Sequence, residues 1–142
     1  MSNPLSDLAR LVSLMEPVLN EGVYVYSSVP PEIDLNSIPL VATFREREGL
    51  TLIALESEAL KAKLPILFRA AWITLTVNSD LEAVGLTAAF ASALADAGIS
   101  CNVVAGAYHD HIFVPVECAE EAMAVLRSLQ LNAARKAERP GK

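Results

Sequence analysis

Cysteine is scarce in this 142-residue sequence, which contains only Cys101 and Cys118. Two cysteines cannot form a disulfide framework or a four-cysteine zinc site. Cys101 falls in a predicted apolar strand and Cys118 just before a predicted helix. We therefore expect both to be small, buried side chains in a reducing compartment.

Positive charge is also scarce, with 11 Lys and Arg residues against 17 Asp and Glu residues and a net charge of −6. This balance argues against binding to nucleic-acid backbones and to anionic membrane surfaces. No apolar run approaches the roughly 18 residues that a membrane span needs, and the N-terminus lacks the pattern of a signal peptide. We expect a soluble, cytoplasmic protein with neither nucleic-acid nor membrane partners.

Hydrophobic residues are abundant, at 53% of the chain, above the roughly 45–50% of ordinary domains. Much of the excess is alanine in predicted helices, which lets helices lie close to a sheet. The remainder indicates a buried subunit interface, so we expect a homo-oligomer.

The N-terminal half predicts two helices and three strands. Asn3 is positioned to cap a helix that starts at Pro4 and carries apolar residues at helical spacing as far as Leu19. Ser57 is positioned to cap a second helix, ending near Lys63. The predicted strands are Val23–Tyr26, Leu40–Phe44 and Leu50–Leu55.

The C-terminal half predicts a strand, a helix, two strands and a helix. These elements are Phe68–Val77, Val84–Ala97, Ile99–Ala105, His111–Pro115 and Ala119–Leu131, with Gly98 ending the first helix in a left-handed conformation. The order predicts an α+β fold with two ferredoxin-like (βαββαβ) subdomains, antiparallel sheets and helices on one face, in which each half lends a strand to the other. The predicted divisions are residues 1–69, residues 70–132 and a flexible tail at 133–142.

Two segments of the C-terminal half resemble the ACT domain. They are Val84-Gly85-Leu86 opening the first helix, and the run Ala97-Gly98-Ile99-Ser100-Cys101-Asn102-Val103-Val104-Ala105. The continuation Gly106–Pro115 is similar to a small, stand-alone ACT subfamily, and the clear resemblance covers Ala71–Gln130. In this chain Val84 stands where many ACT domains have proline, and no terminal strand follows Leu131 unless the first half supplies it.

The resemblance implies a βαββαβ module that binds amino acids in regulated metabolic enzymes. It implies no catalytic role and no cofactor, and any ligand signal would have to reach a separate, unknown regulated protein. The candidate ligand-binding residues gather where the predicted strands meet loops. They are Asn78, Asp80, Glu82, Val84, Gly85, Leu86, Thr87, Asn102, Val103, His109 and Asp110.

Each of these residues also has a structural interpretation. Gly85 either lets a ligand carboxylate approach the N–H groups of a helix start or accommodates a tight turn or a neighbouring subunit. Asn78, Asp80 and Glu82 are candidates to receive an ammonium group, but Asn78 also suits a turn and Asp80 a helix cap. Asn102 interrupts an apolar strand, where it either faces a ligand across an interface or satisfies an exposed strand edge.

His109 and His111 are spaced to share one face of a strand about 7 Å apart. They make two candidate metal ligands without an obvious third, and Asp110 is a candidate partner for a basic ligand side chain. Three hypotheses follow. The leading one is a non-catalytic, allosteric amino-acid-binding module; the others are an interaction protein that has lost its ligand and a metal-dependent enzyme centred on the two histidines.

Overall fold

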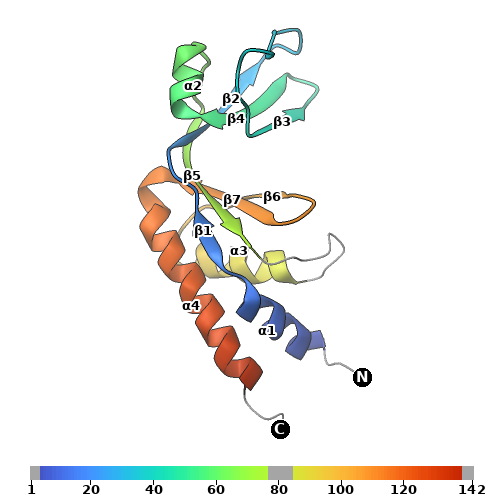
Figure 1. The fold of residues 1–142 in the computed structure, drawn as a ribbon, viewed down its shortest axis with the longest axis vertical. Coiled ribbons are helices and arrows are strands. Elements are labelled where there is room, and N and C mark those ends of the chain that lie inside the picture. The colour runs from blue at the N-terminus through green and yellow to red at the C-terminus, as the bar shows by residue number, and fades with distance from the viewer. Residues whose placement is uncertain (1–3, 77–84, 139–142) are drawn as a thin grey trace.

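The computed structural model of the chain describes residues 4–76 and 85–138 (Figure 1). In chain order the elements are α1 (Pro4–Leu14), β1 (Pro17–Leu19), β2 (Tyr24–Val29), β3 (Ala42–Arg45), β4 (Leu50–Leu55), α2 (Glu56–Lys61), β5 (Phe68–Leu75), α3 (Leu86–Asp96), β6 (Asn102–Ala105), β7 (Asp110–Pro115), a 3-10 turn (Val116–Cys118) and α4 (Ala119–Glu138). The order matches the two-unit α+β arrangement predicted from the sequence.

The strands form one antiparallel sheet in the order β3-β4-β2-β5-β7-β6, with β1 also paired to β5. Residues Phe68–Ala70 of β5 pair with β2, and Ala70–Leu75 pair with β7. β5 is therefore the last strand of the N-terminal unit and the first strand of the C-terminal unit. β1 lies beside Ile73–Leu75 and takes the place of the terminal strand that is missing after Leu131. The predicted exchange of strands is confirmed.

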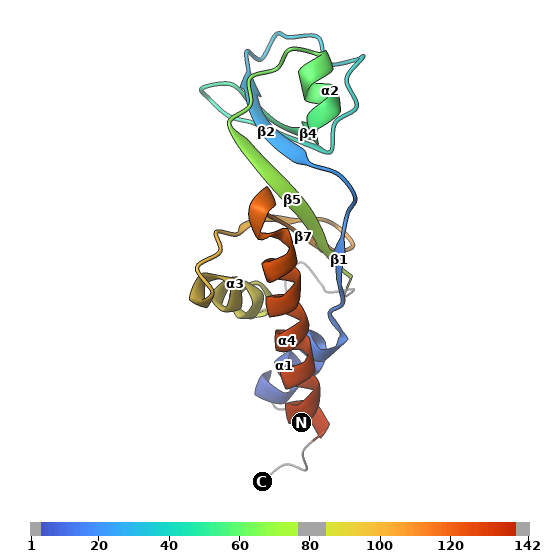
Figure 2. The ribbon, with the colours of Figure 1, turned by 90° about the vertical axis from the view of Figure 1, so that its left-hand side faces the viewer.

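All of the helices in the described residues lie on one face of the sheet. Side chains alternate between the two faces of a strand, and Ala71, Ile73 and Leu75 of β5 are buried in a core that α1, α3 and α4 complete. On the same face of the N-terminal unit, Val25 and Leu52 are buried under α2. Viewed from the helical side, α2 lies at one end of the molecule, and α1 and α4 lead to the other end, where both termini lie (Figure 2). We call the opposite, helix-free surface of the sheet the open face.

Two N-terminal boundaries differ from the prediction. The first helix ends at Leu14 instead of continuing to Leu19, and Pro17–Leu19 form β1. The residue before a proline is disfavoured in the α region, and β1 gains its hydrogen bonds from β5. Ser57 is not a cap, because α2 begins at Glu56 directly after β4 and its N-cap residue is Leu55.

In the C-terminal half, α4 continues to Glu138, past the predicted end at Leu131. Ala133 is buried in the helical core, and the Gln130 Nε2 donates a hydrogen bond to the Ser13 carbonyl at 3.3 Å. Packing against α1 thus explains why the helix continues into residues that the sequence predicts to be a flexible tail. β6 begins at Asn102 instead of Ile99, and Gly98 ends α3 with a φ of +76°, as predicted.

Candidate functional site

Gly85 lies directly before α3 as its N-cap residue, with a φ of +96°. A Cβ at this position would lie 3.1 Å from the Cδ2 atom of Leu8 in α1. The backbone conformation and the contact with α1 account for the glycine without a ligand. Four other predicted site residues lie outside the described residues; they are Asn78, Asp80, Glu82 and Val84.

The helix α3 begins at Leu86, directly after Gly85. Among the described residues, no side chain caps the helix, and the first N–H groups of α3 lie at the positive end of the helix dipole. Leu86 is buried in the core and offers only its backbone, whereas Thr87 is exposed.

Asn102 and Val103 lie on opposite faces of the sheet. Val103 packs against the helical core, while Asn102 pairs with Phe113 and lies at the edge of the open face, its Nδ2 3.5 Å from the Phe113 carbonyl. In β7, Phe113 pairs with Asn102 of β6 on one side and with Trp72 of β5 on the other. Asp110 likewise pairs with Ala105 and with Leu75. Asn102 therefore lies about 10 Å from the strand end that leads to the predicted loop. Because β6 runs parallel to β5, Ala105 lies at the same end of the sheet as Leu75, and Asn102 lies at the other end of β6.

The hairpin between β6 and β7 is closed by a hydrogen bond from the Gly106 N–H to the His109 carbonyl, at 2.9 Å. Asp110 is buried at the start of β7, opposite Leu75 and Ala105. This burial places it poorly for meeting a basic ligand side chain from solvent. Within residues 4–76 and 85–138, no three His, Cys, Asp or Glu side chains come close enough to hold a metal ion.

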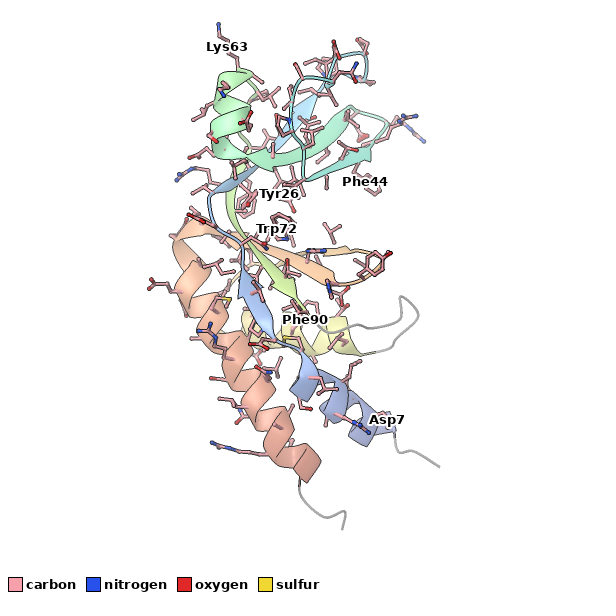
Figure 3. All side chains as sticks on the ribbon, viewed as in Figure 1. Asp7, Tyr26, Phe44, Lys63, Trp72 and Phe90 are labelled. Carbon is pink, nitrogen blue, oxygen red and sulfur yellow. The ribbon has the colours of Figure 1, made fainter. Side chains whose placement is uncertain are left out.

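The open face carries a cluster of aromatic side chains from three strands. The rings of Tyr24 and Trp72 meet edge to face at 5.1 Å, and those of Trp72 and Phe113 stack at 6.0 Å. Tyr26 also meets Phe113 edge to face. Figure 3 shows Trp72 and Tyr26 in the space between the two units, with Phe44 on the outer strand β3.

This cluster borders a cavity of about 480 Å³, which we call the open-face hollow. Its lining residues are Leu40, Val41, Ala42, Trp72, Val104, Gly106, His111 and Phe113. None of these residues is among the ligand-binding residues predicted from the sequence, where His111 is only a candidate metal ligand. The available signal was a pair of aromatic or histidine residues, two or four positions apart, in each of three strands; the pairs are Tyr24 and Tyr26, Phe68 and Trp72, and His111 and Phe113.

His111 is the polar residue of the hollow with a defined hydrogen-bond network. Its Nδ1 accepts a hydrogen bond from the Trp72 Nε1–H at 3.0 Å and lies 3.2 Å from the Thr74 Oγ1. The Asn20 Nδ2 donates to the same Thr74 Oγ1 at 3.0 Å, which leaves the threonine proton to point at His111. Because the indole N–H can only donate, the histidine is neutral with its proton on Nε2.

This network predicts a pH dependence of stability. Burial lowers the pKa of His111 below its ordinary value, and the neighbouring His109 acts in the same direction, against an opposing effect of Asp110. Below a pH of about 6.5 the unfolded chain takes up a proton that the folded chain resists. Stability should therefore fall as the pH drops from about 6.5 towards the lowered pKa.

The measurement is the melting temperature at about pH 7.5 and about pH 5.5, compared between the wild type and His111→Gln. The variant should lose part of the decrease at the lower pH. An NMR titration that places the His111 pKa at or above about 6.5 would contradict the interpretation.

The comparisons with known proteins agree with this architecture. ACT domain family models match residues 3–71 and residues 68–128. A search of curated proteins finds no match. A Vibrio cholerae protein of unknown function, described as a possible transport protein, is 46% identical, with a TM-score of 0.83 over 90% of this chain and 99% of that one.

Two aspartate kinase structures share the fold. Escherichia coli aspartokinase III, in complex with aspartate and ADP, matches with a TM-score of 0.61 and 15% identity over 81% of this chain and 33% of that one. The regulatory subunit of aspartate kinase from Thermus thermophilus, in a ligand-free form, matches with a TM-score of 0.60 and 10% identity over 80% of this chain and 96% of that one.

The fold thus defines a protein of two ferredoxin-like units in a shared sheet. The chain belongs to the ACT domain family and carries two ACT domains in tandem. ACT domains are regulatory modules and not catalytic ones. Over the part of the chain that the structure describes, no helix is both long and apolar enough to cross a membrane.

Proposed function

We propose that this protein is a non-catalytic regulatory module that binds an amino acid or a similarly small ligand and reports the binding to a separate protein. The observation that carries the proposal is the pair of ACT units joined through β5. Because β5 pairs with both β2 and β7, a ligand that favours one arrangement of one unit also biases the other. Such a bias is a coupling free energy that a partner can read.

The proposed amino-acid site is the start of α3. A ligand carboxylate would accept hydrogen bonds from the backbone N–H groups near Leu86 and Thr87, and the acidic side chains of residues 78–82 would receive its ammonium group. Asn102 and Val103 face opposite sides of the sheet, so only one of them can join any single site. Aspartate is the first ligand to test, because the aspartokinase III neighbour is in complex with aspartate and ADP.

A thermal-shift screen of the twenty amino acids, each at millimolar concentration, tests the proposal. A ligand present at 100 times its dissociation constant adds about 2.7 kcal/mol, equivalent to a rise in melting temperature of roughly 5–10 °C for a chain of this size. We expect such a rise for one or a few amino acids. A flat screen would count against the proposal.

Two variants locate the binding. Thr87→Glu places a negative charge at the positive end of α3, where it favours the helix but repels a ligand carboxylate. It should weaken the thermal response without lowering the melting temperature of the free protein. Ser92→Glu adds the same charge to an exposed position in the middle of α3 and should keep the response.

A second candidate function is an interaction protein without a ligand. The contact of Gly85 with Leu8 favours it, because the glycine then serves packing alone. Large apolar side chains that are more than half exposed, including Phe44, Leu67 and Tyr108, also suit an interface. A flat screen together with a tight homodimer in analytical ultracentrifugation would favour this function over ligand binding.

A further inference from the structure

The open-face hollow is built by both ACT units. Leu40, Val41 and Ala42 line it from the N-terminal unit, while Val104 and Gly106 line it from the outer β6 strand of the C-terminal unit and its turn. Val104 also borders a smaller cavity of about 120 Å³ with Phe44 of β3 and Tyr26 of β2. The curled sheet thus brings its two outer strands to the same hollow, and any occupant would touch both units at once.

The lining selects for an uncharged occupant. It contains no Lys, Arg, Asp or Glu, and its polar side chains are His111 and the indole of Trp72. An ion would lose its hydration there without gaining an opposite charge. The volume of about 480 Å³ lies within the roughly 300–1,000 Å³ of small-molecule sites. The stacked rings of Trp72 and Phe113 suit a flat, aromatic molecule.

His111 supplies one hydrogen-bond donor. The Trp72 indole N–H and the Thr74 hydroxyl occupy Nδ1, which leaves the proton on Nε2. Nε2 lies beside Gly106 of the hairpin turn that lines the hollow, since a Cβ at Gly106 would lie 3.2 Å from Nε2 and 2.9 Å from the His109 carbonyl oxygen. No acceptor for this N–H is found among the described residues, and the indole N–H is already used. The hollow therefore offers a single directed donor in an apolar setting.

We propose that the open-face hollow is a second small-molecule site, which takes an uncharged, planar aromatic compound with one hydrogen-bond acceptor such as a carbonyl. The rings of Trp72 and Phe113 bind the aromatic plane, and the His111 Nε2–H donates to the acceptor. The site lies on the face opposite the buried Leu86 side chain and the helices. Binding at this site can therefore be tested separately from binding at the proposed amino-acid site.

The test uses PRODAN, a neutral naphthalene dye with a ketone, together with its analogue N,N-dimethyl-2-naphthylamine, which lacks the ketone. Trp72 is the only tryptophan, so energy transfer from tryptophan to the dye reports binding near this side chain. We expect saturable binding with one dye per chain. The ketone should strengthen binding by about threefold to tenfold, as one hydrogen bond of ordinary strength does, and His111→Phe should abolish that difference.

Val104→Phe fills the hollow and should weaken PRODAN binding at least about tenfold, as the loss of a well-filled apolar contact does. Arg45→Phe adds the same ring to the neighbouring edge strand β3, at an exposed position on the other face of the sheet, and should leave binding unchanged. Ala42→Leu is a second variant that fills the hollow, for use if Val104→Phe has a low melting temperature.

Absence of saturable binding, or equal binding by the wild type and both filling variants, would overturn the proposal. So would a wild-type dimer that excludes the dye and that Val104→Phe dissociates, because a second copy would then occupy the hollow.

Discussion

Replacing Phe90 with alanine is expected to lower the free energy of unfolding by about 3–5 kcal/mol. Phe90 is fully buried in α3 and packs in the core that α1, α4, β5 and β7 share. Alanine would leave a cavity in the centre of that core. Since ordinary domains are stable by only about 5–15 kcal/mol, the variant should unfold at a much lower urea concentration.

Phe44→Ala is the matched control, because it deletes the same ring from a side chain that is 71% exposed. Its effect should stay within about 0.5 kcal/mol. Urea unfolding followed by circular dichroism measures both variants. Equal losses at the two positions would show that the helical core is not the main source of stability.

Replacing Gly85 with alanine is the second large expected effect, a loss of about 2–4 kcal/mol of folding free energy. Two causes add. The φ of +96° is unfavourable for any L residue with a side chain, and the new Cβ would lie 3.1 Å from a methyl carbon of Leu8. Gly98→Ala separates these causes, because Gly98 has a φ of +76° but no atom within 4 Å of its added Cβ. It should lose only about 1–2 kcal/mol.

A double variant with Leu8→Ala identifies the steric part. Removing the Leu8 side chain should relieve some of the cost of Gly85→Ala, so that the two losses are not additive. Unchanged stability in Gly85→Ala, combined with loss of an amino-acid thermal shift, would instead assign the glycine to ligand binding.

The sequence predicted the fold well because its strongest signals are local. Helical spacing and the left-handed glycine at Gly98 located α3, and the missing terminal strand after Leu131 implied that the first half supplies one. The predicted ends of helices and strands were wrong where contacts with distant parts of the chain determine them. The helical spacing continues to Leu19, but Pro17–Leu19 pair with β5 as a strand. Ala133 belongs to a polar tail in the sequence, but it is buried in the core that α1 and α4 share.

The candidate sites were harder to predict because they depend on register. The pairing of β6 with β7 aligns Asn102 with Trp72, and the apolar run around Asn102 does not specify that register. The open-face hollow joins residues from both units, such as Ala42 and Val104, which are far apart in the chain. No single segment carries its signature.

The strand β5 also limits how this chain can be divided. The two ACT matches overlap at residues 68–71, and Ala70 pairs with Tyr24 on one side and Pro115 on the other. Any cut at that junction leaves one fragment with a bare, apolar strand edge of the kind that drives aggregation. We therefore expect the two units to unfold together, and an exchange of one half between related proteins to keep its fold only when β5 moves with it.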